Sequence, residues 1–429
     1  MSRVLLLVPT STYRAADFTA AAARLGVDVV VGSERRQALA SAMGDRAVVV
    51  PLHSIAAGVD AVVALHERSP LDAVVAVDEQ GLEVAAGASA LLGMPYNPPT
   101  AVAATKDKAL MRALLALASV DQPEHRVVEP GGSVLDAAAE LGYPCVAKPV
   151  SRSGSQGVIR VDCGSEATSA AARIRSLVGR DERLLVERFV PGPEIALEGL
   201  LRGGELEVLA VFDKPDPLDG PYFEETIYVT PSRHDDAALH ASRRVVAAAS
   251  AAIGLREGPV HAEVRLGAGG SPRLIEIAAR SIGGLCSRAL RFGAGVSLEE
   301  VVLRHAIGAD LEGLRREPAA SGVMMLPIRR AGVLEGVRGR DEALGVPGVV
   351  GVEITIAAGR PLVPLPEGDR YLGFIFARAS GPAEVEAALR RAEACLEVVV
   401  RGTAPRRRRS PAATVTQPPA RPSVRVQQR

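Results

Sequence analysis

Two glutamates in the stretch from Val260 to Gly284 are spaced so that they would face each other across a β-hairpin. Two apolar runs flank the pair Gly269-Gly270, which is typical of a hairpin turn. Counting outward from that pair puts Glu263 directly opposite Glu276, with Cβ atoms about 5 Å apart. Like charges so placed destabilise a sheet. A divalent cation between the carboxylates would remove the repulsion; the alternative is a solvated face that carries two acids by chance.

Strand alternation adds further side chains to the face that carries these glutamates. Residues two apart on a strand share a face, so His261, Ala278 and Arg280 accompany the pair. The pattern gathers two acids, a guanidinium and an imidazole on one surface, which suits a phosphate-bearing substrate and its metal ion. For His261, packing in the core is an equally good interpretation.

Lysine is scarce in this chain, and its few positions are therefore informative. Of the 50 Lys and Arg residues only four are lysines, namely Lys106, Lys108, Lys148 and Lys214. Where arginine serves as the general surface cation, a remaining lysine indicates a place that needs a compact point charge, such as a phosphate-binding cleft. For Lys108 and Lys214 a plain surface position stays the alternative.

A loop that follows Lys148 has the composition of a phosphate cover. Lys148 ends a short apolar strand, Pro149 stops the pairing of that strand, and Ser151–Gly157 is small, polar and punctuated by glycine. Such a loop can donate backbone N–H groups to a polyphosphate. It is not a Walker A loop, because the lysine precedes the glycines. An ordinary turn is the alternative.

A further apolar strand ends at Glu187, and a Pro-Gly-Pro kink separates it from the next strand, which Glu194 opens. Glu187 could accept a hydrogen bond from an exocyclic amine, with nearby backbone groups reading the rest of a base edge. Glu194 could accept hydrogen bonds from ribose hydroxyls. Edge-strand charges without a ligand are the alternative.

In their order and spacing these stretches resemble the ATP-grasp superfamily, specifically the carboxylate–amine ligases of the L-amino-acid ligase kind. The resemblance covers Val4 to Val400. It implies ATP and Mg²⁺ (or Mn²⁺) as cofactors, with Lys106 and Lys148 on the α- and β-phosphates. It also implies Glu263 and Glu276 as the metal ligands.

The same resemblance implies roles for the other candidates. Arg280 would steady the transferred phosphoryl group, and with Lys148 and Glu276 it forms the predicted catalytic set. The remaining predicted contacts with ATP are those of Ser153, Gly154, Ser155, Gln156, Gly157, Glu187, Phe189, Val190 and Glu194. The predicted substrate contacts are those of Glu225, Tyr228, His261, Arg280, Gly283 and Gly284.

Two positions distinguish this chain from other branches of the superfamily. Many ATP-grasp enzymes have Asn where this chain has Ala278, and the form Glu-x-Ala-Ala-Arg is similar to the amino-acid ligases rather than to the D-alanine ligases. In the substrate loop, relatives often have Phe-x-Glu followed three residues later by His. Here Phe223 and Glu225 are followed by Tyr228.

The alternation of strands and helices predicts the fold class and the domains. Residues 1–98 are expected to form a Rossmann-like α/β domain with a parallel sheet. The resemblance implies an ATP-grasp domain at 99–318 and a small C-terminal α+β domain at 319–401. Residues 402–429 form a basic, Pro-rich tail that cannot bury a core. Asp78 and Glu79 follow a predicted strand, where ligands bind, although a helix cap is favoured.

Composition excludes several classes of function. The net charge is near zero, which argues against a nucleic-acid partner, and no apolar run is long enough for a membrane span. The four cysteines are scattered without CxxC spacing and are expected to be free thiols in a reducing cytoplasm. The tail could bind a polyanion, but a solvated segment is the default. Monomer and homodimer are both open.

The predicted activity is an ATP-dependent carboxylate–amine ligase that forms an amide from small-molecule carboxylate and amine substrates through an acyl phosphate. Amino acids are the expected substrates. Two alternatives stay open at this point. One is a carboxylase or a purine-biosynthesis ligase of the same superfamily, which would use bicarbonate or a ribotide. The other is a nucleotide-binding scaffold that has lost turnover.

Overall fold

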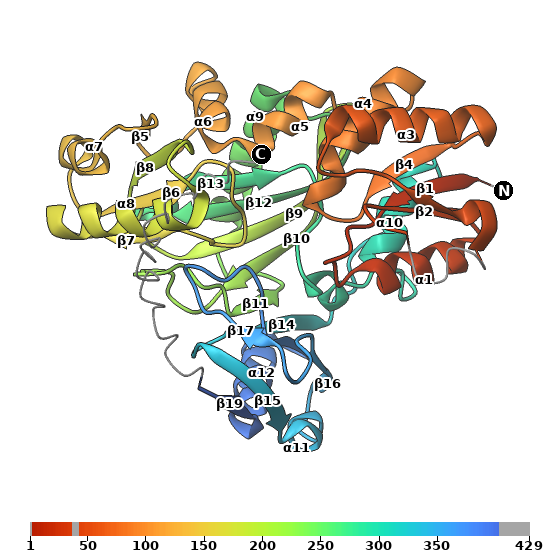
Figure 1. Ribbon diagram of the computed structural model, residues 1–429. Helices are drawn as coiled ribbons and strands as arrows, with labels where there is room; N and C mark the ends of the chain where they lie inside the picture. Colours follow the sequence, from red (N-terminus) through yellow and green to blue (C-terminus); the bar gives the residue numbers. More distant parts are fainter. Residues whose placement is uncertain (1, 37–42, 403–429) are drawn as a thin grey trace, which may run out of the picture.

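An all-parallel sheet occupies the N-terminal part of the computed structural model, which describes residues 2–36 and 43–402 (Figure 1). Its strand order is β3-β2-β1-β4. The sequence prediction of a parallel sheet with helices on its faces is confirmed. The strands are β1 Arg3–Leu7, β2 Asp28–Ser33, β3 Ala47–Val49 and β4 Ala73–Ala76, and the helices are α1 Ala15–Leu25, α3 Ile55–Arg68 and α4 Leu82–Leu92. The predicted tail beyond Gly402 lies outside the described residues.

A break at Asp107 separates two helices that follow each other directly in the sequence. Helix α5 spans Pro99–Lys106 and helix α6 spans Lys108–Leu117. Asp107 has an extended backbone, and its side chain caps α6 by accepting the Leu110 N–H at 2.9 Å. The break turns two lysines that are neighbours in sequence in different directions.

A four-stranded antiparallel sheet, ordered β5-β8-β6-β7, carries the phosphate-loop candidate between β6 and β7. Helices α7 and α8 bury its outer face. Ser133 caps α7, because its side chain accepts the Asp136 N–H. The elements are β5 His125–Val128, β6 Cys145–Pro149, β7 Ile159–Val161, β8 Leu184–Arg188, α7 Val134–Leu141 and α8 Gly164–Val178.

An eight-stranded antiparallel sheet forms the centre of the molecule, in the order β13-β12-β9-β10-β11-β14-β18-β16. Both faces of its central strands are buried: α5, α6 and α9 cover one, and the segment from Ile282 to Phe292 covers the other. The elements are β9 Glu194–Arg202, β10 Glu205–Lys214, β11 Ile227–Thr230, β12 Gly258–Leu266, β13 Pro272–Ala278, β14 Ala320–Leu326, β16 Val349–Ile354, β18 Gly373–Ala379 and α9 Asp236–Ile253.

The sheet continues without interruption from the central into the C-terminal region, because β11 pairs with β14 and β14 with β18. A second sheet, β17-β15-β19, and two helices complete the C-terminal region at the lower end of Figure 1. Helix α10 packs back on the N-terminal domain. The elements are β15 Gly332–Arg338, β17 Pro361–Leu362, β19 Glu397–Arg401, α10 Leu298–Ala306, α11 Arg340–Leu344 and α12 Pro382–Cys395.

The β12–β13 hairpin pairs Glu263 with Glu276, as the sequence predicted. The turn itself differs from the prediction. Next to the turn, Leu266 pairs with Pro272, so the loop is centred on Gly269 alone. A β-bulge between Glu263 and Val264 then shifts the register by one residue and restores the glutamate pair.

Candidate active site

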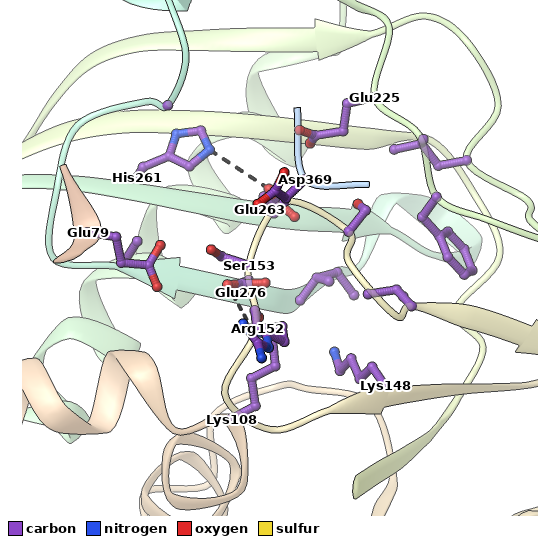
Figure 2. Close-up of a pocket in the computed structure, with 18 of the residues that line it drawn as sticks. Glu79, Lys108, Lys148, Arg152, Ser153, Glu225, His261, Glu263, Glu276 and Asp369 are labelled. Carbon is purple, nitrogen blue, oxygen red and sulfur yellow. Dashed lines mark hydrogen bonds and ion pairs between the residues drawn. The ribbon is translucent and has the colours of Figure 1, made fainter. Parts of the chain in front are cut away.

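One cavity of about 330 Å³ lies where the two antiparallel sheets, the N-terminal domain and a C-terminal loop meet (Figure 2). All five residues predicted to share the hairpin face line it: His261, Glu263, Glu276, Ala278 and Arg280. One end is lined by lysines and the loop after β6. The other end is lined by loops of the N- and C-terminal domains.

Lys108 and Lys148 enter the cavity, whereas Lys106 does not. Lys106 pairs with Glu83 at 2.5 Å on the far side of the α5–α6 break. The predicted contact of Lys106 with phosphate does not fit this placement, and Lys108 replaces it as the candidate, because Asp107 ends α5 and makes Lys108 the first residue of α6. Both cavity lysines are about 95% buried.

Lys148 is held by Glu187, whose predicted contact with a base stays a prediction. Lys148 Nζ lies 2.6 Å from Glu187 Oε2, and Arg112 Nε lies 2.6 Å from Oε1. Burial alone would raise the pKa of Glu187, but Arg112 and Lys148 lower it to about 2. Its carboxylate is thus engaged with two cations, and it lines the cavity together with Phe189 and Val190.

The tip of the predicted phosphate loop lines the cavity with Ser153, Gly154 and Ser155. No backbone N–H of these three residues donates to another of the residues that the structure describes. Lys108 Nζ donates to Arg152 O at 2.5 Å and so ties the loop to the cavity wall. Gln156 and Gly157, also predicted to contact ATP, turn away and bond to the C-terminal region instead.

The facing glutamates are each paired with a lysine, as Figure 2 shows for Glu276. Lys108 Nζ lies 3.2 Å from Glu276 Oε1, and Lys214 Nζ lies 3.6 Å from Glu263 Oε1. Burial raises the pKa of Glu263 to about 8, and Lys214 only partly offsets it. For Glu276 burial acts in the same direction, but Lys108 and Lys148 outweigh it and lower the pKa.

Lys214, which the sequence left open as a surface residue, is buried in a cluster of carboxylates. Its Nζ lies 2.6 Å from Glu194 Oε1 and also pairs with Glu225. Burial opposes its charge, but Glu194, Glu225 and Glu263 prevail and raise its pKa. These three carboxylates approach within 4.8 Å of one another, and the Lys214 ammonium beside all three offsets their repulsion.

Two predicted ligand contacts are engaged with protein groups in this cluster. Glu194, the predicted ribose acid, accepts from Lys214 and, at 2.9 Å, from Arg265 Nε. Tyr228 does not line the cavity; its hydroxyl donates to Glu225 Oε1 at 2.6 Å from behind. Glu225 itself lines the cavity, so Tyr228 orients a cavity carboxylate rather than contacting a ligand.

Arg265 organises the predicted base-binding end and was not anticipated from the sequence. Its Nη1 donates to Val190 O at 2.9 Å, and Nη2 donates to Leu218 O. The guanidinium also stacks against the ring of Phe189, with 5.0 Å to its centroid. One buried side chain thereby joins the segment after β8 to the loop after β10. The sequence does contain a signal for this residue, because Arg265 follows Glu263 by two positions on the same predicted strand and therefore shares its face.

Glu198 anchors the turn that carries Arg280 and the two glycines predicted to contact substrate. It is fully buried and accepts the Ile282 N–H at 3.0 Å. It also lies 3.0 Å from Nδ1 of His261. His261 thus lines the cavity with its ring held from behind, and Gly283 and Gly284 form the adjacent wall.

Arg280 faces the N-terminal domain across the cavity. Its Nη2 lies 3.4 Å from Glu79 Oε2, and the nearby Glu79 and Asp78 carboxylates raise its pKa against the effect of burial. Asp78 caps the turn that follows β4 by accepting the Glu79 N–H at 2.9 Å, as favoured from the sequence. Both acids also line the cavity, so the cap is present and a contact with ligand stays a prediction.

The rest of this end comes from segments to which the sequence analysis assigned no role. Three side chains of a C-terminal loop line it together with two of the N-terminal domain and two sulfur-containing ones from the centre. These are Asp369, Arg370, Tyr371, Ser11, Tyr13, Cys286 and Met325. We call this the substrate end. Its mix of acids, guanidinium groups and apolar atoms suits zwitterionic ligands better than purely apolar ones.

Models of known families match the chain over three ranges. An ATP-grasp N-terminal domain matches residues 18–96, an ATP-grasp domain matches 141–289, and L-amino acid ligase C-terminal domain 2 matches 324–401. The chain belongs to the ATP-grasp superfamily. The resemblance inferred from the sequence is thereby confirmed. Each range falls inside one of the predicted domains, whose boundaries stay predictions.

ATP-grasp proteins similar to this chain include ligases. A solved structure of L-amino acid ligase from Bacillus licheniformis has a TM-score of 0.77 and 26% identity, covering 94% of this chain and 99% of that one. Alanine--anticapsin ligase of Bacillus subtilis is 26% identical over 52% of each chain. The uncharacterized protein y4rH of Sinorhizobium fredii is 28% identical over 70% of this chain and 62% of its own length. The match thus spans less than two thirds of either curated relative.

ATP-grasp enzymes use ATP and divalent metal ions, and the residues present here fit such an ion. Two carboxylates directly opposite on paired strands supply the hard oxygen ligands that Mg²⁺ prefers. Their partners in this structure are two lysines, Lys108 and Lys214, so the pocket between them already holds positive charge. No helix among the described residues is long and apolar enough to cross a membrane.

Proposed function

We propose that this ATP-grasp chain is a carboxylate–amine ligase that joins two small molecules, with amino acids as the expected substrates, in an amide bond. The observation that carries the proposal is the convergence of two buried lysines, a facing glutamate pair and Arg280 on one cavity. Opposite charges at this density suit a triphosphate and its metal ion. The substrate end lies beyond the glutamate pair.

In the first step an oxygen of the substrate carboxylate attacks the γ-phosphorus of ATP, and ADP leaves. Lys108 and Lys148 offset the negative charge of the phosphates, and Arg280 lies where charge develops on the transferred group. Glu263 and Glu276 would hold Mg²⁺, which neutralises phosphate charge when bound. Positioning by the cavity walls supplies much of the rate. The product of this step is an acyl phosphate.

In the second step the amine attacks the acyl carbon, inorganic phosphate leaves, and the nitrogen loses a proton. A carboxylate at the substrate end can accept that proton, and we assign this role to Glu79, which lies beside Arg280. Arg280 remains close to the departing phosphate. The net reaction consumes ATP, a carboxylate and an amine and yields ADP, phosphate and an amide.

The proposal is tested by a phosphate-release screen over pairs of amino acids, with amide products detected by mass spectrometry. We expect at least one pair to release phosphate and to form ADP in a one-to-one ratio with amide. Chromatography of the nucleotides checks the site of attack. AMP and pyrophosphate would contradict the acyl-phosphate route.

Two further arms of the same screen address the alternatives. Replacing the carboxylate substrate by bicarbonate, with the amine kept, separates a ligase from a carboxylase, because only a carboxylase would turn over. ATP binding without release of phosphate for any carboxylate would favour a scaffold. A Glu276→Gln variant provides the matched control, since loss of a metal carboxylate should abolish phosphate release while leaving metal-free ATP binding almost unchanged.

A further inference from the structure

A loop of the C-terminal region, Pro364–Tyr371, touches both ends of the cavity. Its backbone accepts two hydrogen bonds from the end of the phosphate loop. The Gly157 N–H donates to Pro366 O at 2.9 Å, and the Gln156 amide donates to Glu367 O at 2.9 Å. Its last residues line the substrate end: Asp369, Arg370 and Tyr371. We call Pro364–Tyr371 the strap.

A bidentate ion pair fastens the strap to helix α8. Arg173 Nε and Nη2 lie 2.6 and 2.9 Å from the two carboxylate oxygens of Glu367. Arg173 also donates to the Tyr222 hydroxyl and stacks 5.1 Å from the centre of its ring. Tyr222 forms a β-bridge with Ile159, the first residue of the strand that follows the phosphate loop. One guanidinium therefore joins the strap to the base of that loop.

The phosphate loop needs such support, because its own backbone does not favour this shape. Ser155 has φ of +57°, in the sparsely populated left-handed region. At its start the loop is held by Glu182, which accepts the Ser151 N–H at 3.0 Å. Lys108 holds the Arg152 carbonyl. Beyond the tip, two hydrogen bonds from Gln156 and Gly157 to the strap connect the phosphate loop to the C-terminal region.

We propose that the strap is a positioning element of the active site, which holds the phosphate loop over the γ-phosphate and closes the substrate end at the same time. Arg173 and Glu367 are its positioning residues, since neither lines the cavity. A substrate seated against Asp369–Tyr371 would fix the strap and, through it, the loop. Closure would keep water from the acyl phosphate. The expected effect on the reaction rests on the proposed function, whereas the expected effect on how firmly the loop is held does not.

The test uses the full chain with Glu367→Ala and, separately, Arg173→Ala. Both side chains are about two fifths exposed, so folding should change little. We expect cleavage by trypsin after the exposed Arg152 to be at least about fivefold faster, because the loop loses its tie. We also expect KM for ATP to rise about tenfold and more than one ADP to form per amide, since water gains access.

Two further variants separate positioning from a general loss of contacts. The charge exchange Arg173→Glu with Glu367→Arg should restore slow cleavage and most of the affinity for ATP. Gly368→Ala changes no charge, but its Cβ would overlap the carbonyl oxygen of Val363, the residue that precedes the strap, so it should reproduce the single variants. The control is Glu140→Ala, which breaks an exposed ion pair between Glu140 of helix α7 and Arg126 of strand β5.

The outcomes separate the two proposals. The strap has no positioning role if the single variants melt at the temperature of the wild type and show little change in the two other measurements. Little change means that the cleavage rate after Arg152 and the KM for ATP both stay within twofold of the wild type. Failure of the proposed function looks different: the wild type would then release no phosphate with any pair. In that case cleavage of the loop, with and without MgATP, still decides whether Arg173 and Glu367 hold it.

Discussion

The two buried lysines of the cavity, Lys108 and Lys148, each have a carboxylate partner before any ligand binds. Burial lowers the pKa of Lys148, and Glu187 only partly offsets this. Glu187 is itself shared with Arg112, so the two cations compete for one carboxylate. A phosphate that approaches Lys148 therefore adds a second anion to a site with an excess of positive charge, which favours binding.

The two lysines on either side of Asp107 provide a direct residue-scale comparison. We expect Lys108→Met to lower kcat/KM for ATP by about 100-fold, because it removes a cavity charge next to the phosphate loop. Lys106→Met should change it by less than about threefold, because that side chain pairs with Glu83 outside the cavity. Steady-state kinetics with varied ATP measures both. The opposite ranking would return the phosphate role to Lys106.

Glu187 should make stability depend on pH in the acid range. Its folded pKa of about 2 lies below the ordinary value, so the carboxylate stabilises the fold above about pH 4.3 and this is lost as pH falls toward 2. The shift corresponds to about 3 kcal/mol. Melting curves of Glu187→Gln from pH 7 to 3 should show a lower midpoint at pH 7 and a shallower decline than the wild type.

An exposed acid is the control for that series. Glu140→Gln, with a side chain 63% exposed, should follow the wild type at every pH. If Glu187→Gln and the wild type lose stability in parallel as the pH falls, the low pKa of Glu187 is wrong, and its contacts with Lys148 and Arg112 contribute less than their distances indicate.

At the scale of elements, two departures from regular strand and helix geometry position the side chains of the site. The bulge beside Glu263 restores the register that sets the glutamates opposite each other, and the Asp107 break aims Lys108 at the cavity. A third irregularity is the Pro-Gly-Pro kink between β8 and β9. There Pro193 O accepts the Leu266 N–H at 2.9 Å, which brings the kink against β12.

Gly192 makes that kink possible, and its substitution should be costly. Its φ is +114°, and a Cβ would overlap the Leu266 carbonyl oxygen. We expect Gly192→Ala to destabilise the fold by at least about 2 kcal/mol and to raise KM for ATP, because Val190 would shift. Gly203→Ala is the matched control: φ is +59° with open space around it, so about 1 kcal/mol and an unchanged KM are expected. Equal effects would refute the argument from close approach.

At the scale of the whole molecule, Arg14 joins the N-terminal domain to the segment that follows Arg280. It is 1% exposed, donates to Val77 O at 3.1 Å and to Ser281 Oγ at 2.7 Å, and lies 3.7 Å from Glu299. Val77 precedes the acids that line the cavity, and Ser281 follows Arg280. The side chain thus connects two walls of the substrate end from behind.

Replacing Arg14 should separate its effects on stability and on the reaction. We expect Arg14→Met to cost about 3–5 kcal/mol, because Glu299 is left as an unpaired buried charge. Adding Glu299→Gln should restore much of the melting temperature without restoring kcat, since Arg280 still lacks its support. Recovery of both by the double variant would mean that Arg14 serves stability alone.

Much of this could be predicted from patterns of short range. Alternating apolar runs gave the parallel sheet at the N-terminus and the hairpin that pairs Glu263 with Glu276, because periodicity depends only on which face a side chain must bury. Lysine scarcity pointed to Lys148, and it also marked Lys108 and Lys214, which were left open. The spacing of motifs indicated the superfamily.

The tertiary structure alone decided which polar groups meet. Glu187 and Glu194 read as ligand contacts in the sequence, yet each is held by two cations from distant elements, Glu187 by Arg112 and Lys148, and Glu194 by Lys214 and Arg265. Such pairings follow from desolvation: a buried charge must find a partner within a few ångströms, wherever in the chain it comes from. The strap belongs to the same class, because no local pattern links Glu367 to Arg173 across 194 residues.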